Sequence, residues 1–196
     1  MNPDTMQTRE ITRKGTPFTV REEGGERWIE GYFARFDDVY DMGWGVTESI
    51  DRHAFDDTLS DDVRVLTNHD TALVLGRTTA GTAEIRVDDV GLWGRAKINP
   101  ADSDAMNTLA RVERGDVTGA SFGFEIPDGA INREYDMSKG TVHRTLMKVR
   151  LYEVSVCTFP AYEKTEVGVR GKNQNAAAEE NRVWREKQKE RIKKWH

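Results

Sequence analysis

The sequence predicts a mainly β protein with a few helices (α+β class), whose mostly antiparallel strands form a barrel or a strongly curved sheet. Two observations favour this class. Short segments rich in β-branched and aromatic residues recur from Phe18 to about Arg170, separated by Gly, Asp or Asn. Within this part of the chain, only two segments carry helical signals. A chain of 196 residues is long enough for one domain with a buried core.

Strands are expected wherever a short apolar segment lies between turn-forming residues. In chain order these segments are 28–36, 63–69, 82–87, 92–98, 118–126, 142–149, 151–158 and 167–170. A short helix is expected at 54–59. A longer helix is expected at 101–114, with Asn99 as its cap, Pro100 at its first position and Gly115 at its end. Its apolar residues recur at helical spacing, which predicts one buried face.

The two ends of the chain differ in composition from the body. We expect a flexible N-terminus at 1–15, a domain at 16–170 and a charged tail, helical or disordered, at 171–196. The tail carries eight Lys or Arg against four Glu, which leaves 21 basic and 30 acidic residues before it. It is interpreted either as a solvated segment or as an element that docks on a partner.

The composition also excludes some classes of ligand and location. An acidic body disfavours nucleic acid as the main ligand, because phosphate neutralisation supplies most of that affinity. No apolar run approaches the length of a membrane span, and the first residues are polar, so we expect a cytoplasmic protein without a membrane anchor. Cys157 is the only cysteine, so no internal disulfide can form. No HExxH, Walker A or GxGxxG motif occurs, and neither a metal nor another cofactor is expected.

The segment 118–124, Thr-Gly-Ala-Ser-Phe-Gly-Phe, could display a nucleophile. In a strand, Gly119, Ser121 and Gly123 share one face, and the apolar side chains between them share the other. Glycine in a strand often marks a close approach of a ligand or another backbone. A serine that attacks a peptide carbonyl needs such clearance. A barrel strand with a small buried serine is the alternative interpretation of this segment.

A histidine and a glutamate could complete such a site. His69 ends an apolar strand, and histidine is the usual general base near neutral pH, although a strand-end histidine is often structural. Glu153 lies within an apolar strand, where a carboxylate costs free energy unless it has a partner. A histidine is one suitable partner, because the acid fixes its tautomer. A salt bridge to Arg150 or Arg77 is the alternative. Cys157 is a weaker nucleophile candidate, because its β segment lacks the cations or helix terminus that favour a thiolate.

Several motifs in this order resemble the prohead protease family of tailed phages. They are Asn-His-Asp at 68–70, a helix ending in Arg-Gly-Asp at 114–116, Ser-Phe-Gly-Phe at 121–124 and Leu-Tyr-Glu-Val-Ser-Val-Cys-Thr-Phe-Pro-Ala-Tyr at 151–162. Shorter matches lie at 54–59, 75–78 and 91–92, and the resemblance covers about residues 28–170. The family is similar to the herpesvirus assembly proteases. The resemblance therefore implies a herpesvirus-protease-like β-barrel flanked by helices.

Carried over residue by residue, the resemblance implies a serine endopeptidase with Ser121 as nucleophile and His69 as general base. The third member is implied at Glu153. His143 is an alternative, because it follows Ser121 at a herpesvirus-like distance, and Asp70 is a weaker one.

The resemblance also implies a setting for the activity. Oxyanion donors are expected from the backbone near Ala161 and Tyr162, with Gly119 and Gly123 close to the substrate. The expected substrates are the scaffold, the scaffolding segment of the major capsid protein and the protease itself, inside the assembling prohead in the host cytoplasm. A homodimer is a candidate active form. A non-catalytic assembly protein that keeps the same barrel, and an esterase that uses the same serine and histidine, remain alternative functions.

Overall fold

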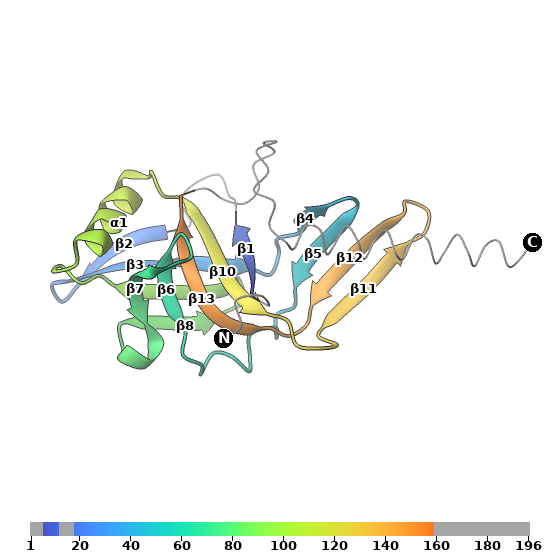
Figure 1. Cartoon of the computed structure of the whole chain (residues 1–196), viewed down its shortest axis with the longest axis horizontal. Helices are drawn as coiled ribbons and strands as arrows, with labels where there is room; N and C mark the ends of the chain where they lie inside the picture. Colours follow the sequence, from blue (N-terminus) through green and yellow to red (C-terminus); the bar gives the residue numbers. More distant parts are fainter. Residues whose placement is uncertain (1–5, 12–17, 159–196) are drawn as a thin grey trace, which may run out of the picture.

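The computed structural model describes residues 6–11 and 18–158, which form three open sheets (Figure 1). The five-stranded sheet has the order β1 (Gln7–Ile11), β10 (Gly119–Glu125), β13 (Arg150–Cys157), β6 (Arg64–Thr67) and β7 (Asp70–Arg77). A four-stranded antiparallel sheet contains β2 (Phe18–Glu23), β3 (Glu26–Arg35), β9 (Gly91–Lys97) and β8 (Ala83–Val87). The other four-stranded sheet contains β11 (Ile131–Asp136), β12 (Thr141–Leu146), β5 (Val46–Ile50) and β4 (Tyr40–Gly43).

One apolar core joins the first two sheets. Phe18 and Phe33 of the β2–β3 hairpin contact each other at 5.2 Å between ring centroids, and Phe122 and Phe124 of β10 stack at 4.9 Å. Phe55, from the segment before β6, meets Phe122 edge to face. Buried aromatic rings contribute strongly to core energetics, so this cluster fixes one face of β10 firmly. The β11–β12–β5–β4 sheet extends to one side of this body (Figure 1).

Helix α1 (Ser103–Arg114) confirms the longer predicted helix. Its cap is Asp102, whose carboxylate accepts two backbone N–H groups of the first turn. Asn99, the predicted cap, instead accepts a hydrogen bond from the backbone of Ala101. Gly115 ends the helix with φ of 82°, in the left-handed region that favours glycine. Within the described residues, no helix is both long and apolar enough to cross a bilayer.

The short helix predicted at 54–59 is wrong. The chain there makes successive turns, in which Ala54, Asp56 and Thr58 each donate to a carbonyl three residues earlier. The buried hydroxyl of Thr58 accepts a hydrogen bond from the backbone of Leu151 in β13. This link to a neighbouring strand, together with local side-chain bonds, holds the segment in turns instead of a helix.

The mainly β class is confirmed, but the predicted herpesvirus-protease-like barrel is not closed, because the described strands form three separate open sheets. In place of several flanking helices, these residues contain α1 and the short 3-10 helix Thr78–Ala80. The sequence patterns also missed β1, β2, β4, β5, β7 and β11. Strands β7 and β11 expose most of their side chains and so lack an apolar alternation. Strand β1 lies within the segment expected to be flexible. The predicted strand at 167–170 and the tail at 171–196 lie outside the described residues.

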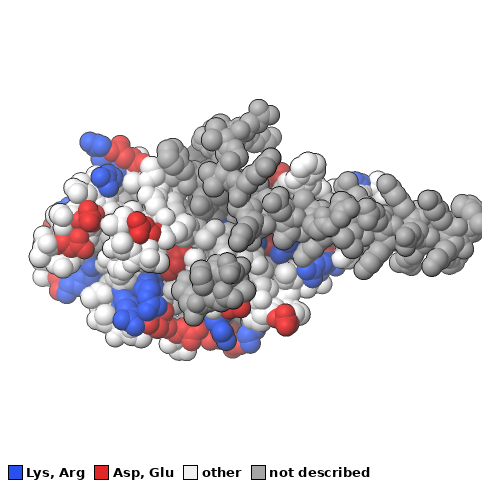
Figure 2. All heavy atoms as spheres, in the orientation of Figure 1, with Lys and Arg blue, Asp and Glu red and all other residues white. Residues whose placement is uncertain are grey.

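Charged side chains of both signs lie interspersed on the face shown in Figure 2. One exposed cluster includes Arg77, which was considered as a partner of Glu153. Arg77 donates to both oxygens of Asp62, at 2.7 and 2.6 Å, and Thr79 adds a third hydrogen bond. These bonds, Arg77 first, hold the pKa of Asp62 below its ordinary value. Arg77, an alternative partner for Glu153, is therefore paired elsewhere.

A buried ion network ties β1 to the sheet that extends to the side. Glu48 of β5 is fully buried and binds the guanidinium of Arg9 from β1. Its other carboxylate oxygen lies 3.1 Å from Nη2 of Arg144 in β12. The guanidinium of Arg9 also lies 5.2 Å from the centre of the Phe124 ring. One carboxylate thus balances two buried cations.

Replacing Glu48 with alanine is expected to lower the free energy of unfolding by about 3–5 kcal/mol, because it leaves two buried guanidinium groups without their shared carboxylate. Urea denaturation measures this loss. The matched control is Glu84→Ala, which removes one of the two exposed glutamates paired with Arg95 and should cost about 1 kcal/mol or less. Equal losses for both variants would contradict the role given to the buried network.

Candidate active site

Strand β10 presents Ser121 on the face opposite the aromatic core. Ala120, Phe122 and Phe124 point into the core, as the alternation of the sequence predicted. Ser121 is fully buried, and its hydroxyl donates to the backbone carbonyl of Arg9 in β1 at 2.9 Å. The hydroxyl of Ser121 thus points toward β1. It would have to turn away from β1 to attack a peptide.

His69 lies in the two-residue turn that joins β6 to β7. Asn68 and His69 have φ of 53° and 59°, the left-handed pair typical of tight hairpin turns. Asn68 tolerates this conformation readily, whereas for histidine it is less common and suggests a functional constraint. The amide of Asn68 exchanges two hydrogen bonds with Thr158, and its backbone N–H donates to Val156. The turn is thereby fastened to the end of β13, and His69 lies in a turn instead of a strand end.

Glu153 of β13 binds the imidazole. Its Oε1 lies 2.7 Å from Nδ1 of His69, and its side chain is only 4% exposed. Its Oε2 accepts a hydrogen bond of 2.6 Å from the hydroxyl of Ser155. Of the partners considered from the sequence, the structure thus gives Glu153 the histidine and neither arginine.

The strand register brings these groups to the same face as the serine. Ser121 lies directly opposite Ser155, and Gly123 lies opposite Glu153. Directly opposed residues of an antiparallel pair share a face of the sheet. Gly123 also makes room for the carboxylate, because a Cβ there would lie 2.2 Å from Oε1 of Glu153. Glycine in this strand was predicted to mark a close approach. At Gly123 the group that approaches is the carboxylate of Glu153.

The remaining candidates lie apart from this cluster or beyond the described residues. His143 belongs to β12, in another sheet, and its ring nitrogens bond to the hydroxyls of Thr47 and Ser49 at 2.9 Å. Asp70 is exposed and caps the backbone of the β7 start through its Oδ1. The hydrogen bonds of both alternative third members thus go to groups other than the imidazole of His69. Ala161 and Tyr162 lie outside the described residues.

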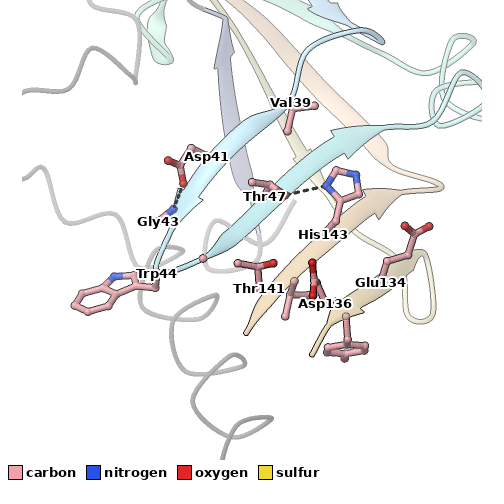
Figure 3. Close-up of a pocket in the computed structure, with 12 residues that line it drawn as sticks. Val39, Asp41, Gly43, Trp44, Thr47, Glu134, Asp136, Thr141 and His143 are labelled. Atoms are coloured by element: carbon pink, nitrogen blue, oxygen red, sulfur yellow. Dashed lines mark hydrogen bonds between the residues drawn. The ribbon is translucent and has the colours of Figure 1, made fainter. Parts of the chain in front are cut away.

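Other side chains of the sheet offer less for chemistry. Cys157 is buried opposite Gly119, and its Sγ lies 3.9 Å from the carbonyl of Ser155. Within the part of the chain that the structure describes, no three His, Cys, Asp or Glu side chains gather as a metal site would need. Figure 3 shows a hollow in the sheet that extends to the side, between β4–β5 and β11–β12. His143 and the exposed Trp44 line it, and none of the His69–Glu153 cluster does.

Two residues of the site were missed by the sequence interpretation. Ser155 shares a face with Glu153, and that alternation was visible in the segment 151–158. It could have been found by asking which neighbour satisfies the second oxygen of a buried carboxylate. Arg9 gives no comparable signal, because its role depends on a backbone carbonyl and on a pairing between distant strands.

This chain was compared with protein families, with known sequences and with solved structures. The sequence pattern of a family described as caudovirus prohead serine protease matches residues 16–180. The prohead protease of Enterobacteria phage HK97 is 27% identical over 169 residues, which cover 84% of this chain and 68% of that protein. The structure of the bacteriophage T4 capsid assembly protease shares 13% identity, with 80% of this chain and 98% of that chain covered and a TM-score of 0.48. The family match spans most of the chain, including the strands that carry the cluster described above. This chain therefore belongs to the caudovirus prohead serine protease family.

Proposed function

We propose that this chain is a serine endopeptidase of capsid maturation, with Ser121 as nucleophile, His69 as general base and Glu153 as the acid that orients the base. The observation that carries the proposal is the 2.7 Å contact between Nδ1 of His69 and Oε1 of Glu153, on the strand paired with that of Ser121. A carboxylate bonded to the Nδ1 proton leaves the lone pair on Nε2, which can take the serine proton.

The reaction would proceed by acyl transfer. Ser121 Oγ bonds to the peptide carbonyl carbon while His69 takes its proton, and backbone N–H groups hold the oxyanion. We retain the region of Ala161 and Tyr162 as the proposed source of those donors. His69 then protonates the leaving amine as the peptide C–N bond breaks. A water then bonds to the acyl carbon while His69 takes its proton, and His69 returns that proton to Ser121 Oγ as the ester C–O bond breaks.

The described conformation corresponds to a resting state in this scheme. Ser121 donates to Arg9 at 2.9 Å, so proton transfer to His69 must follow a rotation of the hydroxyl or a displacement of β1. Catalytic hydrogen bonds are often incomplete without substrate and tighten in the complex. The fully buried serine agrees with a site that opens when a peptide binds.

The proposed substrates are structural proteins of the phage head. The HK97 relative is named a prohead protease, and the T4 structure is named a capsid assembly protease. By analogy, this chain would cleave the scaffold or the scaffolding segment of the major capsid protein, and also itself. It would act inside the assembling prohead in the host cytoplasm, with a homodimer as a candidate active form.

Co-expression with the cognate capsid and scaffold proteins tests this function. We expect mass spectrometry to find shortened head proteins with the wild type and intact ones with His69→Ala. The matched control is His143→Ala, which removes a histidine bonded in another sheet and should leave cleavage in place. If the wild type and His69→Ala give identical chains, a non-catalytic assembly role replaces the protease. Activity on small esters alone would favour an esterase.

A further inference from the structure

Ser155 lies at the centre of the cluster formed by Ser121, His69 and Glu153. The reaction scheme gives it no role. It lies on β13 between two neighbouring strands, opposite Ser121 of β10 and level with Leu66 of β6. Its side chain is fully buried. A buried hydroxyl needs hydrogen-bond partners, and those of Ser155 both belong to the proposed catalytic groups.

The hydroxyl makes two hydrogen bonds with complementary directions. It donates to Oε2 of Glu153 at 2.6 Å and accepts from the backbone N–H of His69 at 3.1 Å. A bond between a hydroxyl and a carboxylate is short and strong compared with one between neutral groups. Ser155 therefore links the acid to the backbone of the base through one atom.

The two oxygens of Glu153 are engaged on different sides. Oε1 contacts the imidazole of His69 beside Gly123, and Oε2 contacts Ser155. With both oxygens engaged, rotation of the carboxylate about its last bond breaks at least one hydrogen bond. The same hydroxyl also holds the turn at His69, whose φ of 59° needs support from surrounding structure.

From this geometry we infer that Ser155 is a positioning residue, which fixes the carboxylate of Glu153 and the backbone of His69 so that Nδ1 and Oε1 stay in contact. The inference rests on the proposed function of the site. Removing the hydroxyl leaves one buried carboxylate oxygen and one N–H of the turn without this partner. Because Ser155 itself would touch no substrate, its effect should pass entirely through the base.

The test compares the wild type with Ser155→Ala and with Ser49→Ala as a matched control. The hydroxyl of Ser49 in β5 lies 2.9 Å from Nε2 of His143, so this control makes the same substitution and removes a hydroxyl bond to a histidine of another sheet. The first measurement is the rate at which a fluorophosphonate modifies Ser121, followed by mass spectrometry. In that step the Ser121 Oγ–P bond forms, fluoride leaves and His69 takes the proton. We expect Ser155→Ala to be slower by about 10²-fold, the loss that a displacement of about 1 Å can produce, and the control to match the wild type.

The second measurement does not depend on any reaction. Proton NMR with ¹⁵N-labelled histidine follows the Nδ1–H signal of His69, which should shift or broaden in Ser155→Ala and stay unchanged in Ser49→Ala. Unchanged rate and signal in Ser155→Ala would overturn the inference, as would equal effects in both variants. If the wild type itself is not modified at Ser121, the proposed protease function fails. The NMR comparison then still decides whether Ser155 positions the histidine.

Discussion

Replacement of Ser121 by alanine is expected to lower cleavage of the cognate head proteins by about 10⁴–10⁶-fold, the range found when a single member of a catalytic triad is removed. The other serine hydroxyl of the described cluster, that of Ser155, is held between the carboxylate of Glu153 and the backbone N–H of His69. The fold should persist, since the substitution removes one hydrogen bond to the carbonyl of Arg9, a loss of about 1 kcal/mol. Cleavage rates of purified wild type and variant, together with their thermal unfolding, measure both expectations.

The matched control for this change is Cys157→Ala. Cys157 is buried on β13, the strand that pairs with β10, and lies two residues after Ser155. It is the only cysteine and was the competing nucleophile in the sequence interpretation. Cys157→Ala should retain activity of the same order as the wild type. If it loses activity as severely as Ser121→Ala while both proteins remain folded, the assignment of the nucleophile to the serine is wrong.

The part of the site that could be predicted from the sequence is the part that local alternation determines. The segment 118–124 indicated that Ser121 and its flanking glycines face away from the aromatic residues, and β10 shows this arrangement. The segment 151–158 indicated a buried strand that contains Glu153, and β13 shows it there. Both predictions need only the two-residue period of a strand. The catalytic roles of Ser121 and Glu153 stay predictions.

The rest depends on contacts between residues far apart in the sequence. The segment 63–69 was predicted to be one strand, yet its last two residues form the left-handed turn into β7. Strand β7 itself was missed, because its exposed side chains show no apolar alternation. The bond from Ser121 to Arg9 depends on β1. The polar sequence of this segment had instead predicted a flexible N-terminus. Similarly, Thr58 bonds to β13 where local spacing favoured a helix. In each case tertiary contacts override a local pattern.

Replacement of Glu153 by glutamine is expected to lower the rate of cleavage by about 10⁴-fold, the loss seen when the triad acid of a serine protease becomes an amide. The change keeps the size of the side chain, so Gly123 still accommodates it. A neutral amide, however, cannot balance the charge of the imidazolium that forms as Ser121 attacks. If the amide turns its NH₂ group toward Nδ1 of His69, the ring must also adopt the wrong tautomer.

The control for this change is Asp70→Asn, which makes the same substitution of amide for acid in the residue next to His69. Asp70 is exposed, and its Oδ1 bonds to the backbone of Ala72 instead of the imidazole. Its variant should therefore cleave at close to the rate of the wild type, while Glu153→Gln retains substrate binding and loses turnover. Because Glu153 is buried and contacts Nδ1 of His69, the loss should appear in kcat with little change in KM. A large loss in Asp70→Asn and a small one in Glu153→Gln would reverse the assignment. In that case the 2.7 Å contact would hold the β6–β7 turn in place without orienting the catalytic base.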